Sequence, residues 1–200
     1  MHDREPDANR HEGEPESREK KRRPEPRIYV ASLADYNEGR LHGAWIDAAQ
    51  SAEELQDAVK EMLQASPSPD AEEWAIHDYE GFGPLRLDEF ESLEVVAKVA
   101  AGIAKHGEVF AVWANYVGLD SDLLDGFEDA YTGEYDSGAD FAEEMLAELG
   151  LLEPLIGQLP EDLRSYVQID YQGYFDDLVS NGQIAAVASR GGGVYVFRIW

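Results

Sequence analysis

The chain has 200 residues and carries 42 Asp and Glu against 16 Lys and Arg, which gives a formal net charge of −26. This excess argues against binding to nucleic acid or to an anionic membrane, because like charges repel, and it favours basic partners. The absence of cysteine excludes disulfides, thiol nucleophiles and zinc–thiolate sites, and it is typical of a reducing compartment. No apolar run approaches the roughly 18 residues of a membrane helix and no signal peptide is evident, so we expect a soluble, cytoplasmic protein.

The first 27 residues differ in composition from the rest of the chain. They hold eight acidic and eight basic side chains and lack Leu, Ile, Val, Phe and Trp. Because such a segment cannot bury an apolar face, we predict that residues 1–27 form a disordered tail. The other 34 acids stand against only 8 bases in residues 28–200, so the folded part carries the whole net charge.

The pattern of residues 28–91 predicts an N-terminal α+β module. Runs of β-branched and aromatic residues indicate strands over residues 27–33, 40–47 and 74–79. A polar turn is expected around residues 37–39. Between the second and third strands, Ser51 and Glu54 have the spacing of a capping box, and the helix that they open ends before Pro67.

The next segment, residues 92–125, predicts a helical module. A helix with a regular apolar stripe follows Ser92 and stops at Gly107, which is a typical residue just beyond a helix C-terminus. A second apolar stripe continues to Gly118.

The last segment, residues 126–200, predicts a C-terminal α+β module. We expect a helix opened by Asp140 and closed by Gly150, followed by a short helix that begins at Pro160. Two closing strands are indicated over residues 183–189 and 194–200, joined by a glycine hairpin turn at residues 191–193. The fold class is therefore α+β, in three modules behind the tail.

No motif supports a catalytic, cofactor or metal site. Carboxylate pairs are frequent, but they follow from composition alone. Asp120 opens a stretch that resembles a calcium loop, yet Leu123 and Leu124 stand where ligand oxygens are needed. The histidines of the folded part lack the spacing of a zinc site or a catalytic triad: His42, His77 and His106. We expect a protein that is not an enzyme, with no cofactor and no metal.

Two explanations of the acidic composition are open at this point. Duplex DNA presents one negative charge per about 1.7 Å of axis, so the net charge corresponds to roughly 44 Å of duplex. The chain thus has enough charge to imitate a DNA segment. Adaptation to high salt also produces acidic surfaces that are poor in lysine, and residues 28–200 contain only three lysines.

Four segments carry a more specific pattern. They are residues 28–47 (IYVASLADYNEGRLHGAWID), 73–80 (EWAIHDYE), 123–137 (LLDGFEDAYTGEYDS) and 170–174 (DYQGY). In this order they resemble ArdA-type antirestriction proteins. The third is similar to the short antirestriction motif of that family, and the fourth to its late D-Y-x-x-Y segment. The tail and the glycine turn depart from the family pattern.

The resemblance implies a small, acidic, non-catalytic protein of the kind encoded on mobile genetic elements. It implies an elongated α+β molecule of three modules that forms a homodimer through its C-terminal region. The dimer would imitate bent B-form DNA and occupy the DNA-binding groove of type I restriction–modification enzymes. The resemblance also places the motif residues Leu124, Phe127, Tyr131 and Tyr135 near the dimer interface.

We expect the DNA-mimic surface to be distributed over many carboxylates rather than focused at one site. Its predicted members lie on the first long helix, in the antirestriction motif and beyond it: Glu53, Asp57, Glu61, Asp122, Asp125, Glu128, Asp129, Glu134, Asp136, Asp140, Glu143, Glu144, Glu148, Asp176 and Asp177. The alternative is an acidic regulatory or chaperone-like module that binds a basic protein and owes its acidity to high salt.

Overall fold

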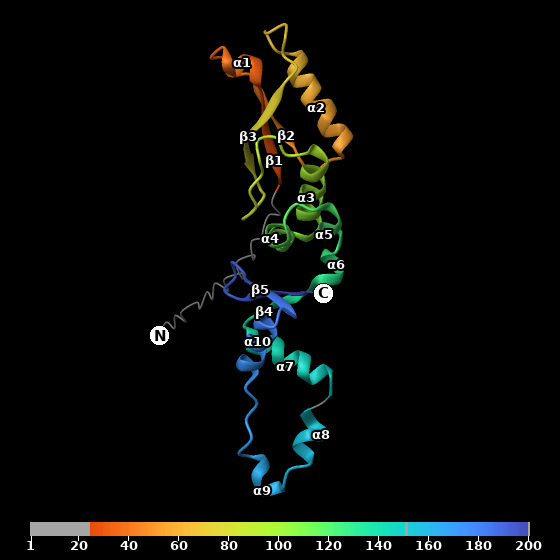
Figure 1. Cartoon of the computed structure of the whole chain (residues 1–200), viewed down its shortest axis with the longest axis vertical. Helices are drawn as coiled ribbons and strands as arrows, with labels where there is room; N and C mark the ends of the chain where they lie inside the picture. Colours follow the sequence, from red (N-terminus) through yellow and green to blue (C-terminus); the bar gives the residue numbers. More distant parts are fainter. Residues whose placement is uncertain (1–24, 151, 200) are drawn as a thin grey trace, which may run out of the picture.

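A computed structural model describes residues 25–150 and 152–199. The molecule is elongated (Figure 1), with a sheet and a long helix at one end and a group of helices in the middle. A second sheet follows, and two short helices lie at the far end. The α+β class and the modular arrangement are thus confirmed, whereas most of the predicted tail, residues 1–24, lies outside the described residues.

The N-terminal sheet is antiparallel, with strand order β2-β1-β3. It and its two helices comprise β1 (Arg27–Ser32), α1 (Leu33–Asn37), β2 (Gly43–Asp47), α2 (Ala52–Gln64) and β3 (Trp74–Glu80). α2 covers one face of the sheet with Leu55, Val59 and Met62, which share one helix face and are buried. All three predicted strands and the predicted helix are present.

The capping box predicted at the start of α2 is confirmed. Ser51 Oγ accepts a hydrogen bond from the Glu54 N–H at 3.2 Å, and the Glu54 carboxylate accepts one from the Ser51 N–H at 2.9 Å. The backbone bond from Ser51, followed by the bond from its hydroxyl, lowers the pKa of Glu54. Two N–H groups that a helix start would leave unpaired are thereby satisfied.

Two local predictions in this module are wrong. The second strand begins at Gly43 rather than at residue 40, and the first strand ends at Ser32 rather than at residue 33, where the helix α1 begins. The polar turn expected around residues 37–39 is present, since Glu38 and Gly39 form a turn after α1. Ser32 Oγ caps α1 by accepting a hydrogen bond from the Asp35 N–H at 3.3 Å. The Arg40 N–H donates a hydrogen bond to the Asp35 carbonyl at 2.9 Å, which holds the loop after α1. A capped helix of little more than one turn is too short to show apolar periodicity in the sequence.

The middle of the molecule is helical, as predicted. It contains α3 (Leu93–His106), α4 (Glu108–Val117), α5 (Ser121–Asp125) and α6 (Phe127–Ala130). Gly107 turns the chain between the first two helices at a φ of +80°, a conformation that favours glycine. A Cβ at Gly102 would lie 2.3 Å from the ring of Phe110, so the missing side chain allows α4 to pack closely on α3.

The C-terminal sheet is antiparallel and is covered on both faces. Its order is β4-β6-β5, and the module comprises β4 (Tyr131–Tyr135), α7 (Gly138–Glu148), α10 (Tyr171–Ser180), β5 (Ile184–Ala188) and β6 (Val194–Arg198). Tyr195 and Phe197 of β6 join the large core that also holds the first sheet and the middle helices. Val196 points to the other face and packs with Phe141 and Phe175 in a second core.

The closing hairpin is confirmed, whereas other details of this module differ from the prediction. β4 and α10 have no predicted counterpart, because a glycine interrupts the pattern of each. α7 begins after Ser137 rather than at Asp140, since the Ser137 hydroxyl accepts a hydrogen bond from the Asp140 N–H at 3.2 Å. In the hairpin turn a Cβ at Gly193 would lie 2.3 Å from the Tyr135 carbonyl oxygen. Trp200 of the predicted last strand lies outside the described residues.

Residues 149, 150 and 152–169 form what we call the C-terminal lobe. It contains α8 (Leu152–Gly157), which is not predicted, and α9 (Glu161–Arg164), which follows Pro160 as predicted. Figure 1 shows the lobe as an open loop that extends beyond the second sheet. None of its described residues is buried, so the lobe has no core of its own.

The large core crosses both predicted module boundaries. It includes Ile28 of the first sheet, Val96 of α3 and Phe197 of β6. The division into modules at residues 28–91, 92–125 and 126–200 therefore stays a prediction, and the packing shows that neighbouring modules share apolar contacts.

Candidate functional site

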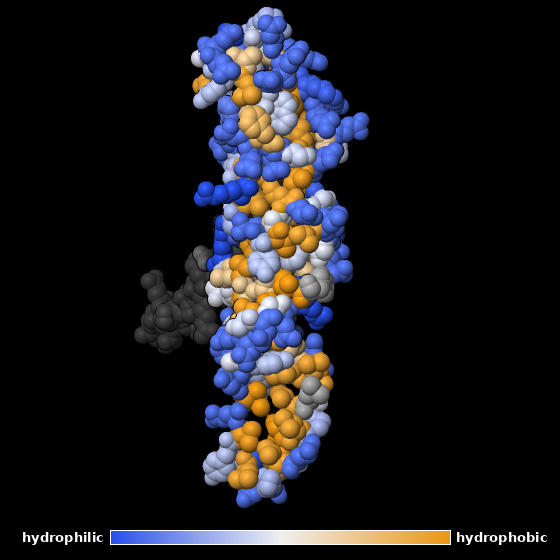
Figure 2. Space-filling model, in the orientation of Figure 1, coloured by the Kyte–Doolittle hydropathy of each residue, from blue (hydrophilic) through white to orange (hydrophobic). Residues whose placement is uncertain are grey.

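Every carboxylate predicted for the acidic surface is exposed. Glu53 and Glu61 lie on α2 near one end of the molecule, while Asp176 and Asp177 lie on α10 beyond the second sheet. Figure 2 shows many hydrophilic residues around the N-terminal end and apolar residues among the hydrophilic ones further along the visible face. The predicted carboxylates thus lie on elements from the first sheet's helix to the second sheet's helix.

Three of the predicted carboxylates have basic partners that the sequence pattern does not indicate. Lys98 Nζ lies 2.7 Å from Asp125 Oδ2, and Lys105 Nζ lies 2.5 Å from Glu128 Oε1. The hydrogen bond from Lys105 lowers the pKa of Glu128.

The third pair is Lys60 with Asp57 on α2, at 2.9 Å. The other twelve predicted carboxylates make no ion pair within the described residues: Glu53, Glu61, Asp122, Asp129, Glu134, Asp136, Asp140, Glu143, Glu144, Glu148, Asp176 and Asp177. Their charges are available to an external partner.

The segment that resembles the antirestriction motif connects the two cores. Leu124 and Phe127 are buried in the large core, and the ring of Tyr131 stacks on Phe127 with centroids 5.4 Å apart. The ring of Tyr135 packs edge-on against Phe141 of the second core, with centroids 5.1 Å apart. Burial raises the pKa of Tyr131. The buried part of this motif thus supports the fold, and its placement near a dimer interface remains a prediction.

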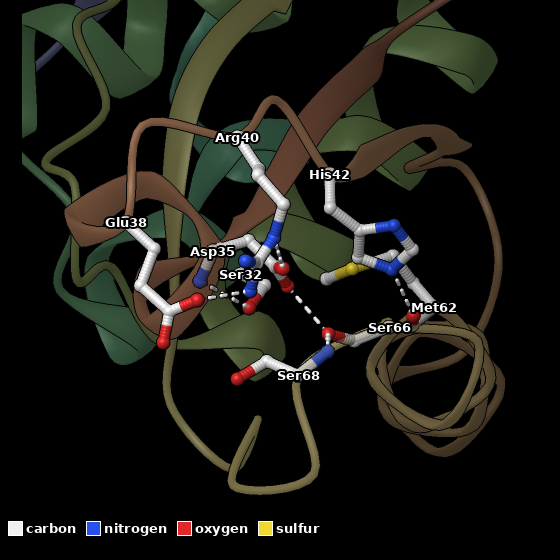
Figure 3. Close-up of polar contacts among 8 residues, drawn as sticks. All are labelled: Ser32, Asp35, Glu38, Arg40, His42, Met62, Ser66 and Ser68. Carbon is white, nitrogen blue, oxygen red and sulfur yellow. Dashed lines mark hydrogen bonds and ion pairs between the residues drawn. The ribbon is translucent and has the colours of Figure 1, made fainter.

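A separate polar cluster surrounds Asp35, whose side chain is fully buried (Figure 3). The Ser66 hydroxyl donates to Asp35 Oδ2 at 2.5 Å, and Arg40 Nε donates to Oδ1 at 2.9 Å. The bond from Ser66 is the main cause that lowers the Asp35 pKa to about 2, with Ser32 and Arg40 acting in the same direction and burial opposing them. All of these contacts lie within the protein, so the cluster ties α1 to the end of α2.

The residues weighed for chemistry take part in structural contacts. His42 Nε2 donates to the Met62 carbonyl at 2.7 Å. Asp120 Oδ1 caps α5 by accepting from the Asp122 N–H at 2.9 Å. Within residues 25–150 and 152–199, no group of three or more His, Asp or Glu is placed to hold a metal ion. The same ranges contain no helix that is both long and apolar enough to cross a bilayer.

Comparison with known proteins decides the family. Residues 28–191 match the family described as Antirestriction protein (ArdA). The chain belongs to the ArdA family. The match covers all four segments of the sequence resemblance and implies antirestriction activity, the inhibition of restriction enzymes. No curated protein matches the chain.

Two surface features of this ArdA protein were not predicted. One is the C-terminal lobe, where Leu155, Leu163 and Tyr166 each expose half or more of their surface and apolar residues gather at the lower end of Figure 2. The other is a groove beside α2. The lobe leucines are spaced like core residues, so the pattern alone gave no sign of their exposure.

Proposed function

We propose that this ArdA protein imitates B-form DNA and inhibits type I restriction–modification enzymes by occupying their DNA-binding groove. The observation that carries the proposal is the distribution of charge along an elongated fold. Exposed carboxylates without basic partners extend from Glu53 on α2 to Asp177 on α10. A groove lined with basic residues would meet these carboxylates where it otherwise meets phosphates.

The physical basis of this competition is the same as for DNA binding. Association releases counterions from the acidic surface and from the basic groove, so the inhibition should weaken as salt rises. Fixed carboxylates present no base edges to the enzyme, and we therefore expect inhibition that does not depend on the recognition sequence of the enzyme.

We also propose that two copies join through their C-terminal lobes. The lobe exposes apolar side chains and carries few charges, namely Glu153, Glu161, Asp162 and Arg164. Two lobes can meet with little repulsion, whereas two of the acidic faces would repel each other. Leu124 and Phe127 are buried within one chain, which favours the lobe over these two side chains as the contact surface. Joining at one end would place the two acidic surfaces in series.

The test adds the purified protein to a type I restriction–modification complex with a labelled DNA substrate. Both DNA binding and cleavage are followed as the protein and salt concentrations rise. The proposal predicts that DNA binding and cleavage fall together and that added DNA restores both. Undiminished DNA binding at saturating protein would contradict mimicry and would favour a different basic partner.

Single carboxylates should matter little. An exposed ion pair contributes about 0–1 kcal/mol, so Glu61→Gln or Asp177→Asn should weaken binding to the enzyme by no more than about fivefold each. Asp125→Asn, which removes a carboxylate that already has Lys98 as a partner, serves as the matched control and should have the smallest effect. A single neutralisation that abolishes inhibition would contradict a distributed surface.

A further inference from the structure

A groove of about 850 Å³ lies at the N-terminal end of the molecule, between α2, the start of β3 and the residues that lead into α3. Its floor is apolar and includes Val59, Leu63 and Trp74. Three carboxylates stand around it: Glu72, Glu73 and Glu91. The groove therefore combines an apolar interior with a negative rim.

Phe90 stands at the edge of this groove with 70% of its surface exposed. Its backbone is held in place on both sides. The Ile76 N–H donates to the Glu89 carbonyl at 2.8 Å, and Ser92 caps the start of α3. An ordered backbone thus presents a large aromatic ring to solvent, next to acidic residues.

The charges around the groove indicate what it can hold. Lys60 also lines it, but its ammonium is paired with Asp57 at 2.9 Å, which leaves the rim net negative. A purely apolar ligand would leave the carboxylates without partners, and a purely basic ligand would leave Phe90 and the floor in water. A segment with both kinds of side chain satisfies both.

We propose that this groove docks a Lys- or Arg-bearing amphipathic segment of the basic enzyme that the protein inhibits. An apolar side chain of that segment packs between Trp74 and Phe90, and its flanking cations pair with the rim. This inference rests on the proposed function and adds an apolar anchor to it.

The anchor gives the complex a contact that a DNA backbone does not offer. Salt screens the attraction between carboxylates and a basic groove, but it does not screen the burial of apolar surface. Part of the affinity should therefore persist at salt concentrations that release DNA from the same enzyme.

The test compares Phe90→Ser with Leu41→Ser. Leu41 is 91% exposed and does not line the groove, which makes it a matched control for the loss of an exposed apolar side chain. The dissociation constant for the type I enzyme is measured over a range of salt. Phe90→Ser should raise it by about tenfold at every salt, with an unchanged salt slope, and Leu41→Ser by less than about twofold. Thermal melting confirms that both variants fold.

Failure of the inference and failure of the proposed function give different results. If the wild-type protein competes with DNA and Phe90→Ser binds equally well, the groove inference is overturned while the proposed function stands. If the wild-type protein does not bind the enzyme at all, the proposed function fails.

In either case the groove is also probed directly, with a short peptide of alternating lysine and leucine. The NMR signal of the Trp74 indole should shift with this peptide in the wild-type protein. It should not shift in Phe90→Ser, nor with an oligolysine of equal charge. An unshifted Trp74 signal would overturn the inference.

Discussion

At the N-terminal end, α2 buries Leu55 completely against the sheet, whereas in the C-terminal lobe Leu163 of α9 leaves half of its surface in water. Both residues belong to helices that carry acidic side chains, α2 with 13 residues and α9 with four. The difference lies in what each helix has to pack against. α2 lies on three strands, and the lobe helices extend beyond the second sheet with nothing described beneath them. A leucine is therefore buried at one end of the molecule and half exposed at the other, because only α2 has a sheet to pack against.

The largest expected effect comes from making the same substitution at both ends. Leu55→Ala should lower the free energy of unfolding by about 3 kcal/mol, because it leaves a cavity in a packed core. Leu163→Ala should change it by less than about 0.5 kcal/mol in the monomer. Urea denaturation at low protein concentration measures both. Equal losses would show that the lobe has a core after all.

The next effect concerns association through the lobe. Leu155→Ser combined with Leu163→Ser should raise the dissociation constant of the dimer by about 100-fold, since each leucine occurs twice in a two-fold interface. Sedimentation velocity over a range of concentrations measures the change. Leu41→Ser, at the opposite end of the molecule, is the control and should leave the dimer intact. An unchanged equilibrium in the double variant would place the dimer contact elsewhere.

A smaller effect is expected at the helix caps. Ser51→Ala removes the capping box of α2 and should cost about 1 kcal/mol of folding stability. Ser165 follows α9 in the lobe and makes no side-chain hydrogen bond within the described residues, so Ser165→Ala should cost less than about 0.5 kcal/mol. Thermal melting of both variants tests whether local order differs between the two ends as described.

The last effect appears only in acid. The Asp35 pKa lies at about 2, below its ordinary value of 3.8, so between these values the unfolded chain binds more protons than the folded one. The stabilisation by Asp35 is therefore complete above about pH 4 and is lost as the pH falls towards about 2. The free energy of unfolding should fall less steeply between about pH 4 and pH 2 in Asp35→Asn than in the wild type. Parallel curves would contradict the bonds to Ser66 and Arg40.

The sequence predicted those elements whose patterns are local and long enough to be recognised. The capping box and apolar stripe of α2 are contained in one helix, and β6 shows its two faces by alternation. α1 is too short for periodicity, and β4 contains Gly133, which weakens its strand pattern. The lobe could not be predicted because Leu155 and Leu163 are spaced like core residues, and exposure depends on what lies beneath them.

The acidic surface was easier to predict than its internal pairing. With so few bases in the folded part, most carboxylates had to be exposed and unpaired. The partners of Asp125 and Glu128 could not be found from the sequence, because Lys98 and Lys105 belong to a different helix and only the fold brings them close. The groove beside α2 escaped prediction for the same reason, since its walls come from three separate elements.

The strand β6 contributes side chains to both cores, and this has a consequence for when the chain can fold. Tyr195 and Phe197 complete one core and Val196 completes the other, yet this strand leaves the ribosome after every other described element. A nascent chain that stops before Val194 therefore lacks the strand that completes the second core and the part of the large core next to the second sheet. Folding should therefore finish only after synthesis of residues 194–198, when the second sheet gains its central strand.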